Sequence, residues 1–155
     1  MTPYLLLKTL HVLSATIVLG TGIGIAWYTL RGWLSGDRRV IRWVSGETVA
    51  ADWLFTGGAA VTLLGSATGM LIINPGWLQQ PWLQLATALT GSVFLLWLPV
   101  VFLQYRLRHH AHNSDDHADD NASLRRIMRA WCLLGAIAFP AMLVIVFLMV
   151  AKPNW

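Results

Sequence analysis

The chain has 155 residues, of which 56% are hydrophobic and 12% are charged, and its mean hydropathy is +0.58. Soluble domains carry about a quarter of charged residues, so this composition predicts a membrane protein. It excludes a soluble enzyme, a dinucleotide-binding domain and a nucleic-acid reader. Three long stretches contain no charge, and they separate Lys8 from Arg31, Asp52 from Arg106, and Arg129 from Lys152.

The uncharged stretches predict one all-α membrane domain, residues 1–155, built as an up-down bundle of four transmembrane helices. The first apolar run follows Thr2 and Pro3, a capping residue and a proline suited to the first helical position. It is too long for the apolar segment of a cleaved signal peptide. The second run ends at Asn74-Pro75-Gly76, a turn signal. The four spans are expected over residues 4–30, 48–73, 81–105 and 123–151.

The basic residues predict the orientation of the bundle, because cytoplasmic loops are enriched in lysine and arginine. Nine of the eleven basic residues flank the loops between spans one and two and between spans three and four. Both termini are therefore expected outside, in a bacterial inner membrane, and the net charge of +4 is expected to favour contact with anionic lipid. Between Asp37 and Ser45, an apolar side faces three arginines, which predicts a short interfacial helix in the first cytoplasmic loop.

Glycines crowd the first two spans, and Gly20/Gly24 and Gly65/Gly69 are spaced four residues apart. Small residues let membrane helices approach closely, so we expect spans one and two to pack tightly together. The same glycines also suit a second interpretation, in which they make room for a flat cofactor. The short connections predict that spans one and two are neighbours, as are spans three and four.

His11 is the most informative polar residue, because it lies within an otherwise apolar span. Ionisable residues inside spans usually face the bundle interior, where they pair or bind something. A neutral imidazole is a good ligand for haem iron, zinc or copper. The alternative is a histidine that hydrogen bonds to a neighbouring carbonyl or hydroxyl group.

If His11 binds haem iron, several residues are candidates to complete the pocket in the outer half of the bundle. Ser14 and Gly22 share the face of His11 at helical spacing. Lys8 is expected either to donate to a haem propionate or to extend to the headgroups. Met70 and Met142 are the candidates for a second iron ligand, although methionine is also a common packing residue.

Asp52 is the acid that lies well inside a span, and it needs a partner there. Arg31 and Arg129 are expected at the same level, so we expect a structural ion pair between Asp52 and one of them. A proton relay through Asp52 is the alternative. Cys132 is the single cysteine, so the chain has no intrachain disulfide.

The connection between spans three and four carries four histidines and four aspartates between residues 109 and 120. This composition can bind Zn²⁺, Ni²⁺ or Cu²⁺, although it has no fixed metal-binding spacing and also suits a solvated loop. The candidate ligands in this segment are His109, His110, His112, His117 and Asp116.

Four segments of the chain resemble a family of bacterial predicted integral membrane proteins that carries a domain-of-unknown-function label. They are residues 7–15, residues 51–56, residues 97–101 with Gln104, and residues 149–153. The resemblance covers essentially the whole chain, and it implies four spans and no particular activity.

The Lys8-x-x-His11 pattern, followed by small residues and Gly20, is similar to the first helix of two other membrane families. These are the small membrane-bound bacterial protoporphyrinogen oxidase and the copper-resistance D membrane domain. The resemblance implies haem b binding at His11. This chain has no lysine inside its third span, where the oxidase pattern has one.

These observations lead to three functional hypotheses. The first is a haem b-binding inner-membrane protein with a redox or tetrapyrrole-handling role. The second is a non-enzymatic accessory or assembly subunit, which contacts a membrane-protein partner or a second copy of the chain through its small-residue faces. The third is metal handling through the His/Asp-rich loop.

Overall fold

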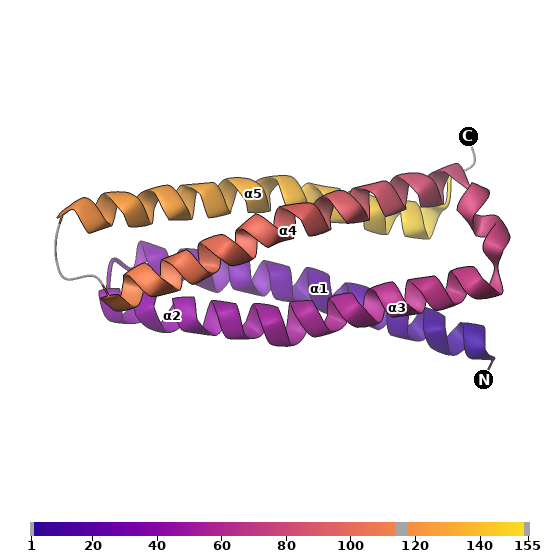
Figure 1. Ribbon diagram of the computed structural model, residues 1–155, viewed down its shortest axis with the longest axis horizontal. Coiled ribbons are helices and arrows are strands. Elements are labelled where there is room, and N and C mark those ends of the chain that lie inside the picture. The colour runs from indigo at the N-terminus through magenta and orange to yellow at the C-terminus, as the bar shows by residue number, and fades with distance from the viewer. Residues whose placement is uncertain (1, 114–117, 154–155) are drawn as a thin grey trace.

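The protein is described by a computed structural model that covers residues 2–113 and 118–153. Four of its helices are long and apolar enough to cross a membrane, which confirms the expected all-helical fold. Figure 1 shows these helices running side by side, with both chain ends at the same end of the molecule. The four candidate spans are Pro3–Leu34, Arg38–Ile73, Pro81–His112 and Ala122–Ala151.

Helix α1 (Pro3–Leu34) begins as its sequence predicts. The side chain of Thr2 accepts a hydrogen bond from the backbone N–H of Leu5, at 3.4 Å, and Pro3 occupies the first turn. The helix ends at a tight turn in which Gly36 has a φ of +69°. A residue with a side chain rarely adopts this conformation, so Gly36 lets the chain reverse within a few residues.

The second long helix combines three elements in one continuous rod: α2 (Arg38–Ala51), a π-helix η1 (Asp52–Gly57) and α3 (Gly58–Ile73). Asp37 caps it, because its carboxylate accepts from Arg39 N at 2.7 Å. Residues 38–45 are the first turns of this continuous rod, and their placement at a membrane interface stays a prediction. Val44 and Val49 are buried where α2 packs against α1 and α4, whereas Trp43 is exposed.

A short 3₁₀ helix, η2 (Pro75–Gln79), connects this rod to α4 (Pro81–Asn113), and the last helix is α5 (Ala118–Ala151). Pro99 and Pro140 lie inside α4 and α5. Helix α1 packs against α3, and α4 packs against α5. The predicted neighbours are therefore confirmed.

We call the end of the bundle that holds the α1–α2 turn and the α4–α5 connection the basic end, and the opposite end, where both chain termini lie, the terminal end (Figure 1). At the basic end, two apolar clusters join α1, α4 and α5. Trp33 and Leu103 pack against both clusters. The buried members of the clusters are Ile25, Leu107, Leu124, Ile127, Met128 and Trp131.

Most of the glycines do not make the close helix contacts that their spacing predicts. A methyl group added to Gly69 would lie 3.0 Å from Leu7, so α3 and α1 do meet closely there. Methyl groups added to Gly20, Gly24 or Gly65 would find nothing within 4 Å. The expectation of tight packing at both glycine pairs is therefore wrong for three of these four positions, because in the middle of the bundle the glycines face open space.

Candidate functional site

The imidazole of His11 is held by α3. Its Nδ1 lies 3.2 Å from the carbonyl oxygen of Leu63 and 3.3 Å from Oγ of Ser66. Ser66 in turn donates to the backbone carbonyl of Thr62 at 2.7 Å. The hydrogen-bonded arrangement that we considered for His11 is therefore present in the structure.

This contact also fixes which ring nitrogen of His11 carries the hydrogen. A backbone carbonyl can only accept, so Nδ1 must donate and Nε2 keeps its lone pair. No other described residue forms a hydrogen bond to Nε2. Histidines that ligate metals almost always donate their second ring nitrogen to a carbonyl, a carboxylate or water. The ring is therefore arranged as a ligand would be, with one nitrogen anchored and the other available.

The other predicted cofactor residues lie on three different helices. On α1, Ser14 is buried, whereas Lys8 and Gly22 are exposed. Met70 on α3 and Met142 on α5 are both half-buried. Helices α1 and α3 are already in close contact next to Met70, because Gly69 packs against Leu7. Met142 belongs to the other helix pair.

A second polar site surrounds Asp52, in the π-helix η1. Asp52 is 5% exposed, and its Oδ2 accepts a hydrogen bond of 3.0 Å from the indole Nε1 of Trp97 on α4. The side chains of Thr56 and Gln104 lie beside the same carboxyl group. Trp97 and Gln104 join Asp52 from α4, so this carboxyl group connects the second and third spans.

The expected ion pair between Asp52 and Arg31 or Arg129 is not formed among the described residues. Both arginines are exposed, whereas the side of the rod that carries Asp52 turns toward α4. The partner that the structure provides is a neutral indole N–H from Trp97. Asp52 is therefore a buried acid without a basic partner in the described part of the chain.

Buried hydroxyl groups continue from Asp52 toward the basic end. The hydroxyls of Thr29 and Thr48 lie 2.7 Å apart, and Ser45 donates to the carbonyl of Arg42 at 2.9 Å. All three of these side chains are at most 2% exposed. Sequence reasoning missed these residues and Gln104. The signal was present in the spacing of Ser45, Thr48, Asp52 and Thr56, which repeats every three or four residues and defines one helix face.

Three buried polar atoms near this level of the bundle have no hydrogen-bond partner among the described residues. They are Thr56 Oγ1 on η1, Gln104 Oε1 on α4 and Trp131 Nε1 on α5. A buried polar atom without a partner costs about 1–3 kcal/mol. Buried polar atoms in folded proteins are usually paired, so these three mark the polar part of this level of the bundle.

The described part of the His/Asp-rich segment forms no metal site. His109 and His110 contact each other edge to face, with ring centroids 6.1 Å apart, and Nδ1 of His112 lies 2.9 Å from the carbonyl oxygen of Arg108. Within residues 2–113 and 118–153, no three histidine, cysteine, aspartate or glutamate side chains gather as metal ligands would. The candidate ligands His117 and Asp116 lie outside the described residues.

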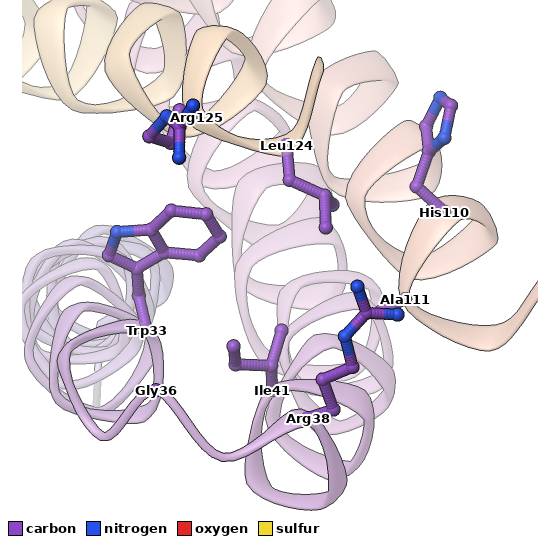
Figure 2. Close-up of a pocket in the computed structure, with 8 residues that line it drawn as sticks. All are labelled: Trp33, Gly36, Arg38, Ile41, His110, Ala111, Leu124 and Arg125. Atoms are coloured by element: carbon purple, nitrogen blue, oxygen red, sulfur yellow. The ribbon is translucent and has the colours of Figure 1, made fainter. Parts of the chain in front are cut away.

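A cavity of about 320 Å³ opens at the basic end, between the α1–α2 turn and the adjoining ends of α4 and α5. Figure 2 shows Trp33, Ile41 and Leu124 on its apolar walls, with Arg38 and Arg125 on α2 and α5. Gly36 also lines this cavity. Arginines at the membrane boundary attract anionic headgroups, so the character of this cavity fits the predicted contact of this end with lipid.

The fold and its buried polar groups define a class, the polytopic integral membrane proteins. Residues 5–153 match the family described as predicted integral membrane proteins, DUF2269, and the chain belongs to this family. This confirms the resemblance carried by the four segments named above. No curated protein and no solved structure matches the chain. The similarity of the first helix to the protoporphyrinogen oxidase and copper-resistance D families stays a prediction.

Proposed function

We propose that this membrane protein binds haem b in the half of the bundle near the terminal end, with Nε2 of His11 as an axial ligand. Its role would be redox chemistry or the handling of tetrapyrroles. One observation carries the proposal: Nδ1 of His11 is anchored on the carbonyl of Leu63, which leaves the lone pair of Nε2 for iron. A bound haem supplies reversible one-electron chemistry at its iron.

The surroundings of His11 support a flat ligand. Gly20, Gly22 and Gly24 follow His11 on α1, and a methyl group added at any of them would meet nothing within 4 Å. Helices α1 and α3 form one pair and α4 and α5 form another. A porphyrin placed beside His11 would lie between these pairs, in contact with the glycine-rich part of α1.

Met142 is the better candidate for the second axial ligand. His11 lies about 12 Å along its helix from Pro3, and Met142 lies about 14 Å along its helix from Ala151, so the two residues are at similar depths. Met70 lies only about 4.5 Å along its helix from Ile73, so it is nearer the terminal end than His11. Its helix also packs directly against α1, because a methyl group added to Gly69 would lie 3.0 Å from Leu7. This contact leaves no room for a porphyrin between α1 and α3.

Lys8 and Ser14 flank His11 by one helical turn on either side. Lys8 is exposed and lies nearer the terminal end, where its ammonium group would pair with a propionate. Ser14 is buried and lies deeper in the bundle. We assign these two residues to opposite edges of the same pocket.

We also propose that the basic end faces the cytoplasm of a bacterium. Nine of the eleven basic residues flank the loops at that end, and cytoplasmic loops carry such an excess. The haem would then lie in the outer half of the cytoplasmic membrane. Labelling of single cysteines introduced at the two ends with a membrane-impermeant reagent tests this orientation.

Absorption spectroscopy of the purified protein tests haem binding directly. The full chain is purified in detergent from haem-replete cells, and spectra are recorded oxidised and after reduction with dithionite. We expect a Soret band in the wild type and its loss in His11→Ala. The matched control is His112→Ala, an exposed histidine far from this site, which should keep the band.

Three further variants separate the loss of an iron ligand from a loss of folding. Ser66→Ala keeps the imidazole but removes one contact of Nδ1, so we expect retained haem with a shifted reduction potential. Met142→Ala should change the spectrum of the reduced protein, whereas Met70→Ala should not. A colourless wild type, or a Soret band that persists in His11→Ala, overturns the proposal.

A further inference from the structure

The site around Asp52 holds neutral polar groups. The carboxyl group and the oxygens Thr56 Oγ1 and Gln104 Oε1 lie in one buried region, and both of those oxygens lack a partner among the described residues. The indole N–H of Trp97 donates to one carboxylate oxygen. The hydroxyl of Thr56 and the amide of Gln104 can donate to a carboxylate, and their oxygens can also accept from a protonated acid.

The negative charge of an ionised Asp52 would not be compensated by a neighbouring cation. Removing an ionised carboxylate from water costs several kcal/mol unless an opposite charge compensates for it. No described lysine or arginine pairs with Asp52. The described site thus lacks a compensating positive charge, and a single proton on the carboxyl group neutralises it.

We propose that Asp52 is a proton-binding site of this protein, in which the neutral carboxylic acid donates its O–H to the buried oxygen of Gln104 or Thr56. The carboxylate oxygen takes the proton from a hydronium ion, which leaves a water molecule, and the reverse step returns it. No electrons move, so the step needs no oxidant or reductant. The proposal does not rest on haem binding at His11.

None of the described titratable groups on the neighbouring elements places a positive charge beside Asp52. Tyr28 of α1 is half-buried and lies close to Thr48, while Glu47 of α2 is exposed and negative. The neighbours from α4 are the neutral side chains of Trp97 and Gln104. On α5, Arg129 and Cys132 are exposed. Each of these described groups is neutral, negative or turned outward.

A metal cation fits the site less well than a proton does. Ions such as Ca²⁺ and Mg²⁺ need about six or more oxygen ligands. The described side chains that surround the position are those of Asp52, Thr56 and Gln104, which offer too few oxygens.

The hydroxyl groups of Thr48, Thr29 and Ser45 provide a route between Asp52 and the basic end. They are buried, lie on the same face of the rod as Asp52 or against it, and can both donate and accept a proton. Beyond Thr56, the same face continues with the buried residues Ala59 and Ala60, which cannot relay a proton. Proton exchange is therefore expected from the basic end. The π-helix that carries Asp52 supports a functional role, because π-helical turns are rare and frequently occur at functional sites.

Infrared spectroscopy of the full chain tests the proposal, because a protonated carboxyl group absorbs apart from the carboxylates. At neutral pH we expect the band of one protonated carboxylic acid in the wild type, shifted in deuterium oxide and lost in Asp52→Asn. The matched control Asp37→Asn changes an exposed acid that caps α2 and should keep the band. A wild type without this band, or a band that persists in Asp52→Asn, overturns the proposal.

Two other measurements keep the test decisive even if Asp52→Asn does not fold. Gln104→Leu removes one acceptor, so the band should shift to higher frequency as the hydrogen bond of the acid weakens. Replacing choline chloride by sodium chloride should leave the band unchanged, and its loss would show that a metal cation competes for the site.

Thr48→Val should slow exchange of the carboxyl proton for deuterium. An unchanged exchange rate would contradict the route through Thr48.

Discussion

At the basic end, side chains from α1, α2, α4 and α5 share one interior, whereas around His11 the helices pack in separate pairs. Trp33, Leu103 and Leu107 lie within the shared interior. In the other half, the glycines of α1 face open space. The comparison shows that one bundle combines an end in which four helices share an apolar interior with a half in which the glycines of α1 have no close neighbour.

The physical reason for this difference lies in the environment of the helices. Lipid is as apolar as a leucine side chain, so burial of apolar surface does not drive membrane helices together, and packing and polar contacts decide where they meet. The basic end has both, including the Thr29–Thr48 contact and the Asp52–Trp97 hydrogen bond. The half around His11 has the contacts between α1 and α3 and between α4 and α5, and the aromatic contacts of Tyr4, Trp77 and Trp82 at the terminal end connect the two pairs.

The largest effect should come from truncating a leucine at the packed end. Leu107→Ala removes a side chain that is 4% exposed from the cluster of α4 and α5. It should lower the free energy of unfolding by about 2–5 kcal/mol. Leu133→Ala on α5 changes a leucine that is 66% exposed and should change it far less. Denaturation with sodium dodecyl sulfate, followed by circular dichroism, measures both values, and equal losses would show that burial of Leu107 in the cluster does not stabilise the basic end.

Two glycine substitutions should change the free energy of unfolding by smaller amounts. The substitution at Gly32 should lower it, and the one at Gly20 should leave it unchanged or raise it. A methyl group at Gly32 would lie 2.9 Å from the branched side chain of Val44, so Gly32→Ala should destabilise the bundle by about 1–3 kcal/mol. Gly20→Ala meets nothing and should be neutral or stabilising by up to about 1 kcal/mol. The same denaturation assay compares the two, and a loss at Gly20 would show that α1 is covered there.

The smallest effect is expected at the terminal end, where Lys152 packs on a cluster of aromatic side chains. The Nζ of Lys152 lies 5.1 Å from the ring centroid of Trp77 and 5.6 Å from that of Trp82, and Tyr4 packs edge to face on Trp77. Lys152→Met should lower the unfolding free energy by about 0.5–1 kcal/mol. It should also change the tryptophan fluorescence. An unchanged spectrum and stability would mean that these contacts do not hold the terminal end.

Composition and charge were sufficient to predict the four spans and the pairing of neighbours. Both follow from local rules, since an uncharged stretch of this length must cross the membrane and short connections keep consecutive spans adjacent. The start of the second helix was harder to predict. Val40, Ile41 and Val44 are interspersed with three arginines, a pattern that fits a membrane surface and a helix interface equally well. The structure buries Val44 where α2 packs against α1 and α4.

The environment of Asp52 could not be predicted from its own neighbours in the sequence. Its partner, Trp97, lies on another helix, and the π-helix leaves no recognisable sequence pattern. Arginine was the obvious partner by charge, but Arg31 and Arg129 face outward. For His11 the sequence predicted two alternatives, and the structure shows that a carbonyl contact at one ring nitrogen leaves the other open for a ligand.

The six π-helical residues, Asp52–Gly57, also set the rotational phase between the two ends of the second rod. Each residue of a regular helix turns it by about 100°. A π-helix turns less per residue, because its hydrogen bonds span five residues instead of four. Converting this segment into a regular α-helix of the same length would therefore rotate α3 relative to α2, and Leu63 and Ser66 would turn away from His11 while Asp52 kept its place beside Trp97. The π-helical geometry of this segment thus aligns the histidine site with the carboxyl site.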